Sequence, residues 1–152
     1  MCLTVYDKKP SIAKQDMYVW KIVRTNGNKW IGPYMFDFAK FSFDAIVKPK
    51  RPKPFKYSIY ERNVGHKIKY DIKGGYFHSS LTKEDCEKLF PFVRDCLSRA
   101  KMGVYGATCK EFAMEFDRLE ICKCTIPART KYYTDEICVA SKRLIVHKPK
   151  IL

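Results

Sequence analysis

Residues from about 82 to 101 form the one stretch of this chain in which apolar side chains recur at helical spacing along its whole length. Thr82 followed by Asp85 resembles a capping box, and Gly103 suits the end of a helix. Pro91 predicts either a kink or the start of a second helix. The stripe indicates one main helix with a buried face made by Cys86, Leu89, Phe90, Val93, Cys96, Leu97 and Ala100.

Strands are predicted before this helix. Residues 17–24 are rich in β-branched and aromatic side chains, and because both of their faces are apolar they predict a central strand. Residues 29–47 alternate loosely and predict one long bent strand or two short ones. Prolines 49, 52 and 54 then favour an extended loop, because proline cannot donate to a central strand ladder.

A second β segment lies just before the helix. Residues 66–73 place Ile68, Tyr70 and Ile72 on one face and charged side chains on the other, which is typical of a half-buried antiparallel strand. The glycine pair at 74–75 predicts a hairpin turn into a strand at 76–79.

The remainder of the chain predicts one short helix and further strands. Thr108 and Glu111 have the spacing of a capping box for a helix at about 109–117. Strands are expected near 119–126, 137–140 and 143–147. The order of elements is β-rich, helical and β-rich again, and no linker divides it. We therefore expect an α+β fold with a mostly antiparallel sheet, in a single domain that spans residues 1–152.

Positive charge is concentrated in one part of the chain. The formal net charge is +14, and residues 48–75 contribute half of it with nine basic and two acidic groups. An acidic partner is therefore expected. The candidates for phosphate contact are basic residues of the loop at 48–56, namely Lys48, Lys50, Arg51 and Lys53. Phe55 and Tyr57 lie beside them and could stack on a base. The alternative is a solvated loop whose charges favour solubility.

A second candidate site lies where the predicted hairpin strand enters the main helix. Tyr76 and His78 share one face of that strand, and Ser79 and Ser80 approach the helix start. Free N–H groups there could hold an anion, with His78 as a donor or an acid–base group. The alternative is that the serines cap the helix and the histidine lies at the sheet edge.

The cysteines and the hydropathy limit other functions. Cys122 and Cys124 are separated by one residue and have no second close pair, so we expect no metal site, and the sequence indicates no cofactor. No apolar run reaches the roughly 20 residues of a membrane helix, and residues 1–16 lack the apolar core of a signal peptide. Free thiols in the cytoplasm are the expected state of the seven cysteines.

Three parts of the chain resemble small uncharacterised proteins encoded in gut bacteriophage and prophage genomes: residues 1–23, residues 74–90, and residues 122–133 with 139–146. The resemblance implies an accessory protein that acts in the bacterial host cytoplasm. Residues 74–90 are also similar to the corresponding segment of ADP-ribosyltransferase folds. That second resemblance implies NAD as cofactor, with Arg24 as the residue nearest to the cofactor position and Glu120 or Glu136 nearest to the catalytic glutamate.

The leading hypothesis is a non-catalytic protein that holds a phosphate-bearing ligand, either a nucleotide or a nucleic acid. In a phage, such a protein could act in counter-defence, with a host defence protein as a further partner. The alternatives are an ADP-ribosyltransferase-like enzyme and a virion or assembly component whose positive charge meets packaged DNA.

Overall fold

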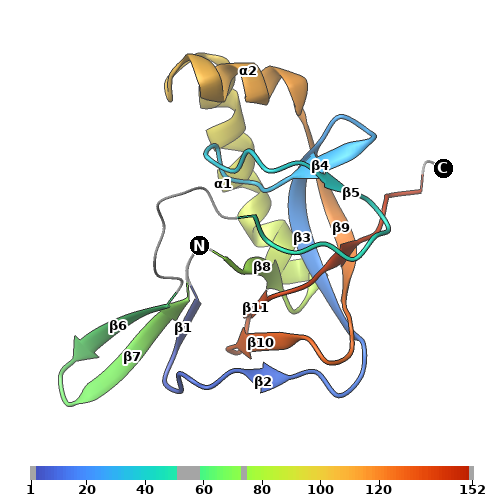
Figure 1. Cartoon of the computed structure of the whole chain (residues 1–152). Helices are drawn as coiled ribbons and strands as arrows, with labels where there is room; N and C mark the ends of the chain where they lie inside the picture. The colour runs from blue at the N-terminus through green and yellow to red at the C-terminus, as the bar shows by residue number, and fades with distance from the viewer. Residues whose placement is uncertain (1–2, 51–58, 73–74, 151–152) are drawn as a thin grey trace.

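A computed structural model describes residues 3–50, 59–72 and 75–150 (Figure 1). Within these residues the predicted α+β class is confirmed, with mostly antiparallel sheets, one main helix and one short second helix. No helix of the described part is long and apolar enough to cross a membrane.

The main sheet contains most of the strands. They are β2 (Ser11–Ile12), β3 (Met17–Thr25), β4 (Lys29–Ile31), β5 (Phe41–Ser42), β8 (Phe77–Ser80), β9 (Arg118–Ile126), β10 (Lys131–Thr134), β11 (Cys138–Ser141) and β12 (Ile145–Val146). Their order is β12-β9-β3-β8-β11-β10-β2, with β4 paired to β3 and to β5. The predicted central strand is confirmed, because β3 lies between β9 and β8 and buries residues on both of its faces, among them Ile22 and Val23. Residues 29–47 contain two short strands rather than one long one.

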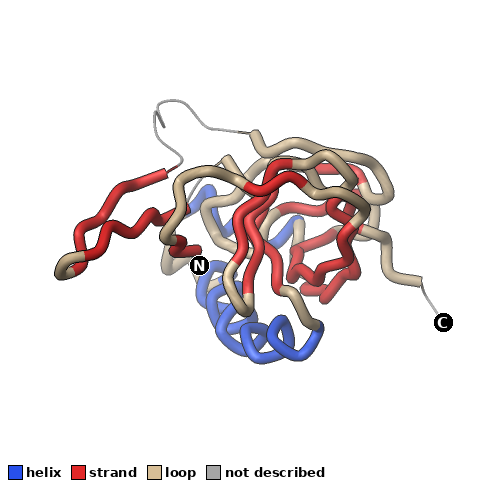
Figure 2. The backbone as a smooth tube through the Cα atoms, turned by 90° about the horizontal axis from the view of Figure 1, so that it is seen from below, coloured by secondary structure: helices blue, strands red, loops and turns tan. Residues whose placement is uncertain are grey.

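A small second sheet is formed by β1 (Leu3–Val5), β6 (Ile59–Val64) and β7 (Lys67–Ile72), in the order β1-β7-β6. The β6–β7 ribbon projects from the rest of the molecule in both views (Figures 1 and 2). The predicted hairpin between residues 66–73 and 76–79 is wrong: β7 pairs with β1 and β6, whereas β8 pairs with β3 and β11. The predicted buried face of this strand is present only toward the end of β7, because Ile72 is buried whereas Ile68 is exposed.

The main helix α1 (Lys83–Lys101) begins as its sequence predicts. Thr82 is its N-cap, and the Asp85 backbone N–H donates to Thr82 Oγ1 at 3.2 Å. The helix continues through Pro91, and Gly103 follows it with a φ of +84°. The second helix, α2 (Ala107–Glu115), begins after Gly106, which has no side chain to cap it. The capping box predicted from Thr108 is therefore wrong, because Thr108 lies inside the helix.

The core is built from aromatic and aliphatic side chains on these elements. Trp30 stacks on Phe41 with ring centroids 4.6 Å apart, and Phe77 packs against both. A second cluster joins the small sheet to β10 and β11 through Leu3, Ile72 and Tyr133. A third lies between the helices and the segment after β4, and comprises Met35, Leu97, Ala100, Cys109 and Ala113.

Candidate functional site

A cavity of about 410 Å³ is surrounded by positive charge. Of the eight described residues that line it, five are basic and none is acidic. We call it the basic pocket, and its lining consists of Lys48, Pro49, Gly75, Arg129, Thr130, Lys131, Lys142 and Arg143. Five positive charges around one cavity repel one another, and a bound anion would reduce that repulsion. The basic pocket therefore suits an anionic ligand.

Backbone pairing brings these residues together from three parts of the chain. The turn between β9 and β10 carries Arg129, whose N–H donates to the Ala13 carbonyl at 2.7 Å and whose φ is +69°. The segment after β11 returns alongside it, with the Lys142 N–H donating to the Lys131 carbonyl at 3.1 Å. Val47 and Leu144 exchange backbone hydrogen bonds of 3.0 and 3.2 Å, which place Lys48 beside Arg143.

Two of the cations are held in place by the fold. The Arg143 guanidinium donates from Nε to Thr130 Oγ1 at 3.1 Å and from Nη2 to the Ala128 carbonyl at 2.9 Å. Lys142 Nζ donates to the Gly75 carbonyl at 2.9 Å and lies 4.0 Å from the ring centroid of Tyr76. These contacts fix the positions of two positive groups in advance, which lowers the entropic cost of binding an anion.

The other cations are more accessible. Lys48, Arg129 and Lys131 are exposed. Among the described residues, neither these three nor Arg143 forms an ion pair with a carboxylate. The pocket therefore keeps its positive charge for a ligand.

The structure divides the residues singled out from the basic loop. Lys48 lines the basic pocket, whereas Lys50 Nζ lies 5.6 Å from the ring centroid of Phe41, outside it. Arg51 and Lys53 lie outside the described residues, as do Phe55 and Tyr57. Sequence reasoning missed the residues of the two turns, and the short basic runs at 129–131 and 142–143 were the signal that could have found them.

The residues predicted at the helix entry separate in the same way. Tyr76 adjoins the basic pocket through its contact with Lys142. His78, Ser79 and Ser80 instead line a different cavity, between α1 and strands β3 and β8.

The start of α1 is already occupied by partners from the chain itself. The Leu81 N–H donates to the Ile137 carbonyl at 2.8 Å, and the Asp85 N–H donates to Thr82. The first turn also carries the acidic residues Glu84 and Asp85. Negative side chains at a helix N-terminus already satisfy its partial positive charge, so this end of α1 offers less to an anion than the basic pocket does.

Arg24, the residue that the ADP-ribosyltransferase resemblance places nearest to NAD, is fully buried. Its Nε donates to the Gly32 carbonyl at 3.0 Å, and its Nη2 donates to the carbonyls of Tyr34 and Asp37 at 2.8 and 3.1 Å. Burial lowers the pKa of Arg24 to about 10, an effect that the nearby Asp37 carboxylate partly opposes. The guanidinium thus holds the segment after β4 against β3.

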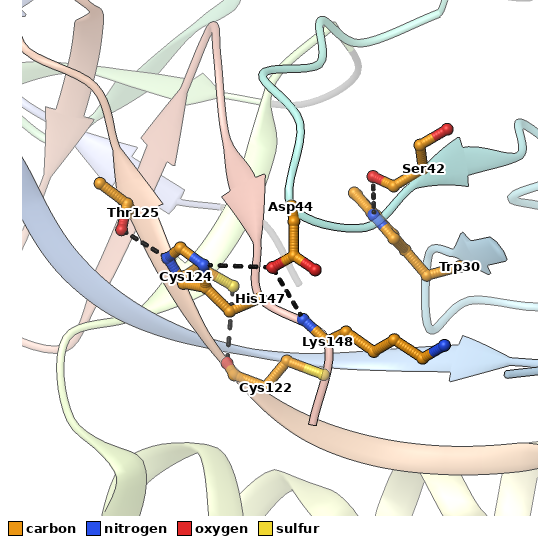
Figure 3. Close-up of polar contacts among 8 residues, drawn as sticks. All are labelled: Trp30, Ser42, Asp44, Cys122, Cys124, Thr125, His147 and Lys148. Carbon is orange, nitrogen blue, oxygen red and sulfur yellow. Dashed lines mark hydrogen bonds and ion pairs between the residues drawn. The ribbon is translucent and has the colours of Figure 1, made fainter. Parts of the chain in front are cut away.

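A hydroxyl, an imidazole and a carboxylate meet where β12 ends (Figure 3). Thr125 Oγ1 lies 2.7 Å from His147 Nε2, and His147 Nδ1 lies 3.5 Å from Asp44 Oδ1. A catalytic triad has this order of groups, but it also needs a substrate cavity and donors for an oxyanion. Thr125 is buried, and none of the three residues lines either cavity described here. The arrangement ties β12 to β9 and to the turn at Asp44.

Cys122 and Cys124 lie in the main core cluster and are free thiols. Burial raises the pKa of Cys122 to about 12 and raises that of Cys124 as well, so both thiols are neutral at pH 7. In the described part of the chain, no group of three or more His, Cys, Asp or Glu side chains is placed to hold a metal ion.

Comparison with known proteins gives no relative of this chain. No protein-family model matches it, and neither a curated protein nor a solved structure does.

Proposed function

We propose that this chain binds a phosphate-bearing ligand, a nucleotide or a nucleic acid, in the basic pocket and does so without catalysis. The observation that supports the proposal is that the described residues around one cavity of about 410 Å³ include five cations and no carboxylate. Arginine and lysine are the side chains that proteins use to contact phosphate oxygens, with arginine able to form two parallel hydrogen bonds.

The pocket suits this ligand in size and in polarity. Its volume falls within the range of about 300–1,000 Å³ that is common for small-molecule sites. Its polar lining comes from ammonium and guanidinium groups, so most of the binding free energy would be electrostatic. Binding of a nucleic acid to such a site is expected to weaken steeply as salt is added.

The phage resemblance suggests a biological setting for this activity. In a bacterial host, a protein with such a pocket would sequester a nucleotide signal or cover a nucleic acid that a defence protein recognises. Both roles need binding and neither needs a reaction, which agrees with the choice of a non-catalytic site.

The test compares two lysine pairs that carry the same charge. Lys48→Gln with Lys131→Gln removes two cations from the pocket, and the control, Lys50→Gln with Lys148→Gln, removes two exposed cations outside it. Binding of ATP and of a fluorescent single-stranded oligonucleotide is measured between 50 and 200 mM NaCl. The pocket variant should bind more weakly, with the slope of log K against log salt for the oligonucleotide reduced by about 0.7 per lost contact.

The control variant should show nearly the same slope of log K against log salt as the unaltered protein. If both pairs change binding equally, net charge rather than the pocket attracts the ligand, and the proposal fails. It fails equally if the unaltered protein binds neither ATP nor the oligonucleotide at 50 mM NaCl.

A further inference from the structure

A second cavity, of about 220 Å³, lies between α1, strands β3 and β8 and the segment after β4. We call it the apolar pocket. Its lining is Trp20, Lys21, Ile22, Pro33, Tyr34, His78, Ser79, Ser80, Cys86, Leu89, Phe92, Val93 and Cys96. Most of these side chains are hydrocarbon or aromatic, so the pocket differs in kind from the basic pocket and takes a different ligand.

A lysine lies within these apolar walls. Lys21 has only 6% of its surface exposed, and its Nζ donates to the His78 carbonyl at 2.7 Å. Among the described residues, no carboxylate lies within ion-pair distance of that nitrogen. Burial lowers the pKa of Lys21, with nearby Asp37 acting in the opposite direction. A buried amine without a counter-ion is costly, and an anion placed beside it would offset that cost.

The Cys86 thiol in the lining carries no charge that could balance the Lys21 ammonium. Burial raises the pKa of Cys86 to about 11, so its thiol is neutral at pH 7 and does not supply the missing negative charge. Within the described part of the chain, the cavity therefore holds a buried cation without a partner anion.

The rim of the pocket is open to solvent and is aromatic. Phe92 on α1 is 73% exposed, and Tyr34 on the segment after β4 is 45% exposed. Exposed aromatic side chains at the mouth of a cavity can contact the apolar part of an entering ligand.

We propose that the apolar pocket binds a small molecule with an apolar body and a single carboxylate, which pairs with the Lys21 ammonium. The apolar body contacts Leu89, Phe92 and Val93. This site is separate from the basic pocket and does not depend on the proposed phosphate ligand.

A carboxylate fits better than a phosphate for two reasons. Lys21 is the only lysine or arginine among the described residues that line the pocket, and one positive charge balances one carboxylate, whereas a phosphate ester carries a charge of about −1.5 to −2. The volume of about 220 Å³ is also below the range of about 300–1,000 Å³ typical of drug-sized ligands, so a chain or ring of a few carbons is expected.

The experiment compares hexanoate with 1-hexanol, which has the same chain and no charge. Binding is followed at pH 7 by tryptophan fluorescence, because Trp20 lines the pocket. Hexanoate should bind about tenfold more tightly than hexanol, since a hydrogen bond to a charged group contributes more than a neutral one. In Lys21→Met the preference should disappear while hexanol still binds.

Three results would overturn the proposal: no binding of either compound, equal binding of both in the unaltered protein, or an unchanged preference in a folded Lys21→Met variant. Phe92→Ala serves as a second variant, because an exposed rim residue can be truncated without unfolding the chain. Phe92→Ala should weaken the binding of hexanoate and hexanol equally, and unchanged hexanoate binding in this variant would show that the ligand does not occupy the apolar pocket. Lys48→Gln with Lys131→Gln should leave hexanoate binding intact, and a loss would place the carboxylate in the basic pocket instead.

Discussion

Replacing Arg24 with leucine should cost the protein much of its stability. The side chain is fully buried, and its guanidinium donates three hydrogen bonds to carbonyl oxygens of Gly32, Tyr34 and Asp37. Leucine fills part of the same volume but donates nothing, so three carbonyls lose a partner. The segment that links β4 to β5 is held to β3 by these bonds, and its attachment should weaken first.

The size of the effect follows from the contacts. Hydrogen bonds to a charged group contribute about 1.5–3 kcal/mol each, which for three bonds gives an upper limit of roughly 4–9 kcal/mol. Two gains offset part of the loss: a charged group is no longer buried, and Nη1, which has no partner among the described residues, is removed. We expect a net loss of about 3 kcal/mol.

Urea denaturation followed by circular dichroism measures this loss. With a slope of about 2 kcal/mol per M, the midpoint should fall by about 1.5 M. Arg24→Lys should lose nearly as much, because one ammonium cannot reach three carbonyls as a planar guanidinium does. Arg94→Leu, at an exposed position on α1, is the control and should change stability by less than about 0.5 kcal/mol.

A loss below about 1 kcal/mol in Arg24→Leu would refute this structural role. If such a stable variant also lost an NAD-consuming activity that the unaltered protein possessed, Arg24 would be a cofactor residue, as the ADP-ribosyltransferase resemblance implies. Stability and NAD consumption, measured on the same variant, thus separate the enzyme alternative from a binding protein.

Two further changes test the local geometry. A methyl group at Gly32 would clash with the Asp37 side chain, 2.9 Å from its Cβ, so Gly32→Ala should lower stability by about 1–3 kcal/mol in thermal denaturation. The same substitution should cost much less in an Asp37→Gly background, compared with Asp37→Gly alone, and an equal cost in both backgrounds would contradict the clash. Iodoacetamide should modify half-buried Cys96 well before buried Cys122 when the sites are mapped by mass spectrometry, and equal rates would contradict the packing around β9.

The spacing of apolar residues predicted those helices and strands that bury the same faces along their whole length. The main helix was visible because its apolar stripe and its Thr82 cap both act within one element. The central position of β3 followed from apolar residues on both faces, since only a strand with neighbours on each side and layers above and below can bury them.

Long-range pairing was not predictable in the same way. Two glycines before β8 suggested a hairpin between β7 and β8. Instead, the chain turns at Gly65 so that β6 pairs with β7, and β8 pairs with β3 and β11, which are distant in sequence. Long-range contacts also explain why residues 29–47 alternate only loosely between apolar and polar side chains. Between the short strands β4 and β5, the chain is held by a buried arginine rather than by a ladder, and such a contact leaves no periodic pattern.

The candidate site shows why segment charge is a poor guide to surface charge. Residues 76–152 carry fourteen basic and ten acidic groups, which makes that half of the chain unremarkable beside the net +7 of residues 48–75. Six of those ten acidic groups lie on α1 and α2. The turn after β9 and the segment after β11 are basic, and strand pairing places them beside Lys48. The fold thus separates acidic and basic groups that nearly cancel along residues 76–152. Of the five cations in the described lining of the basic pocket, only Lys48 belongs to the basic segment 48–75.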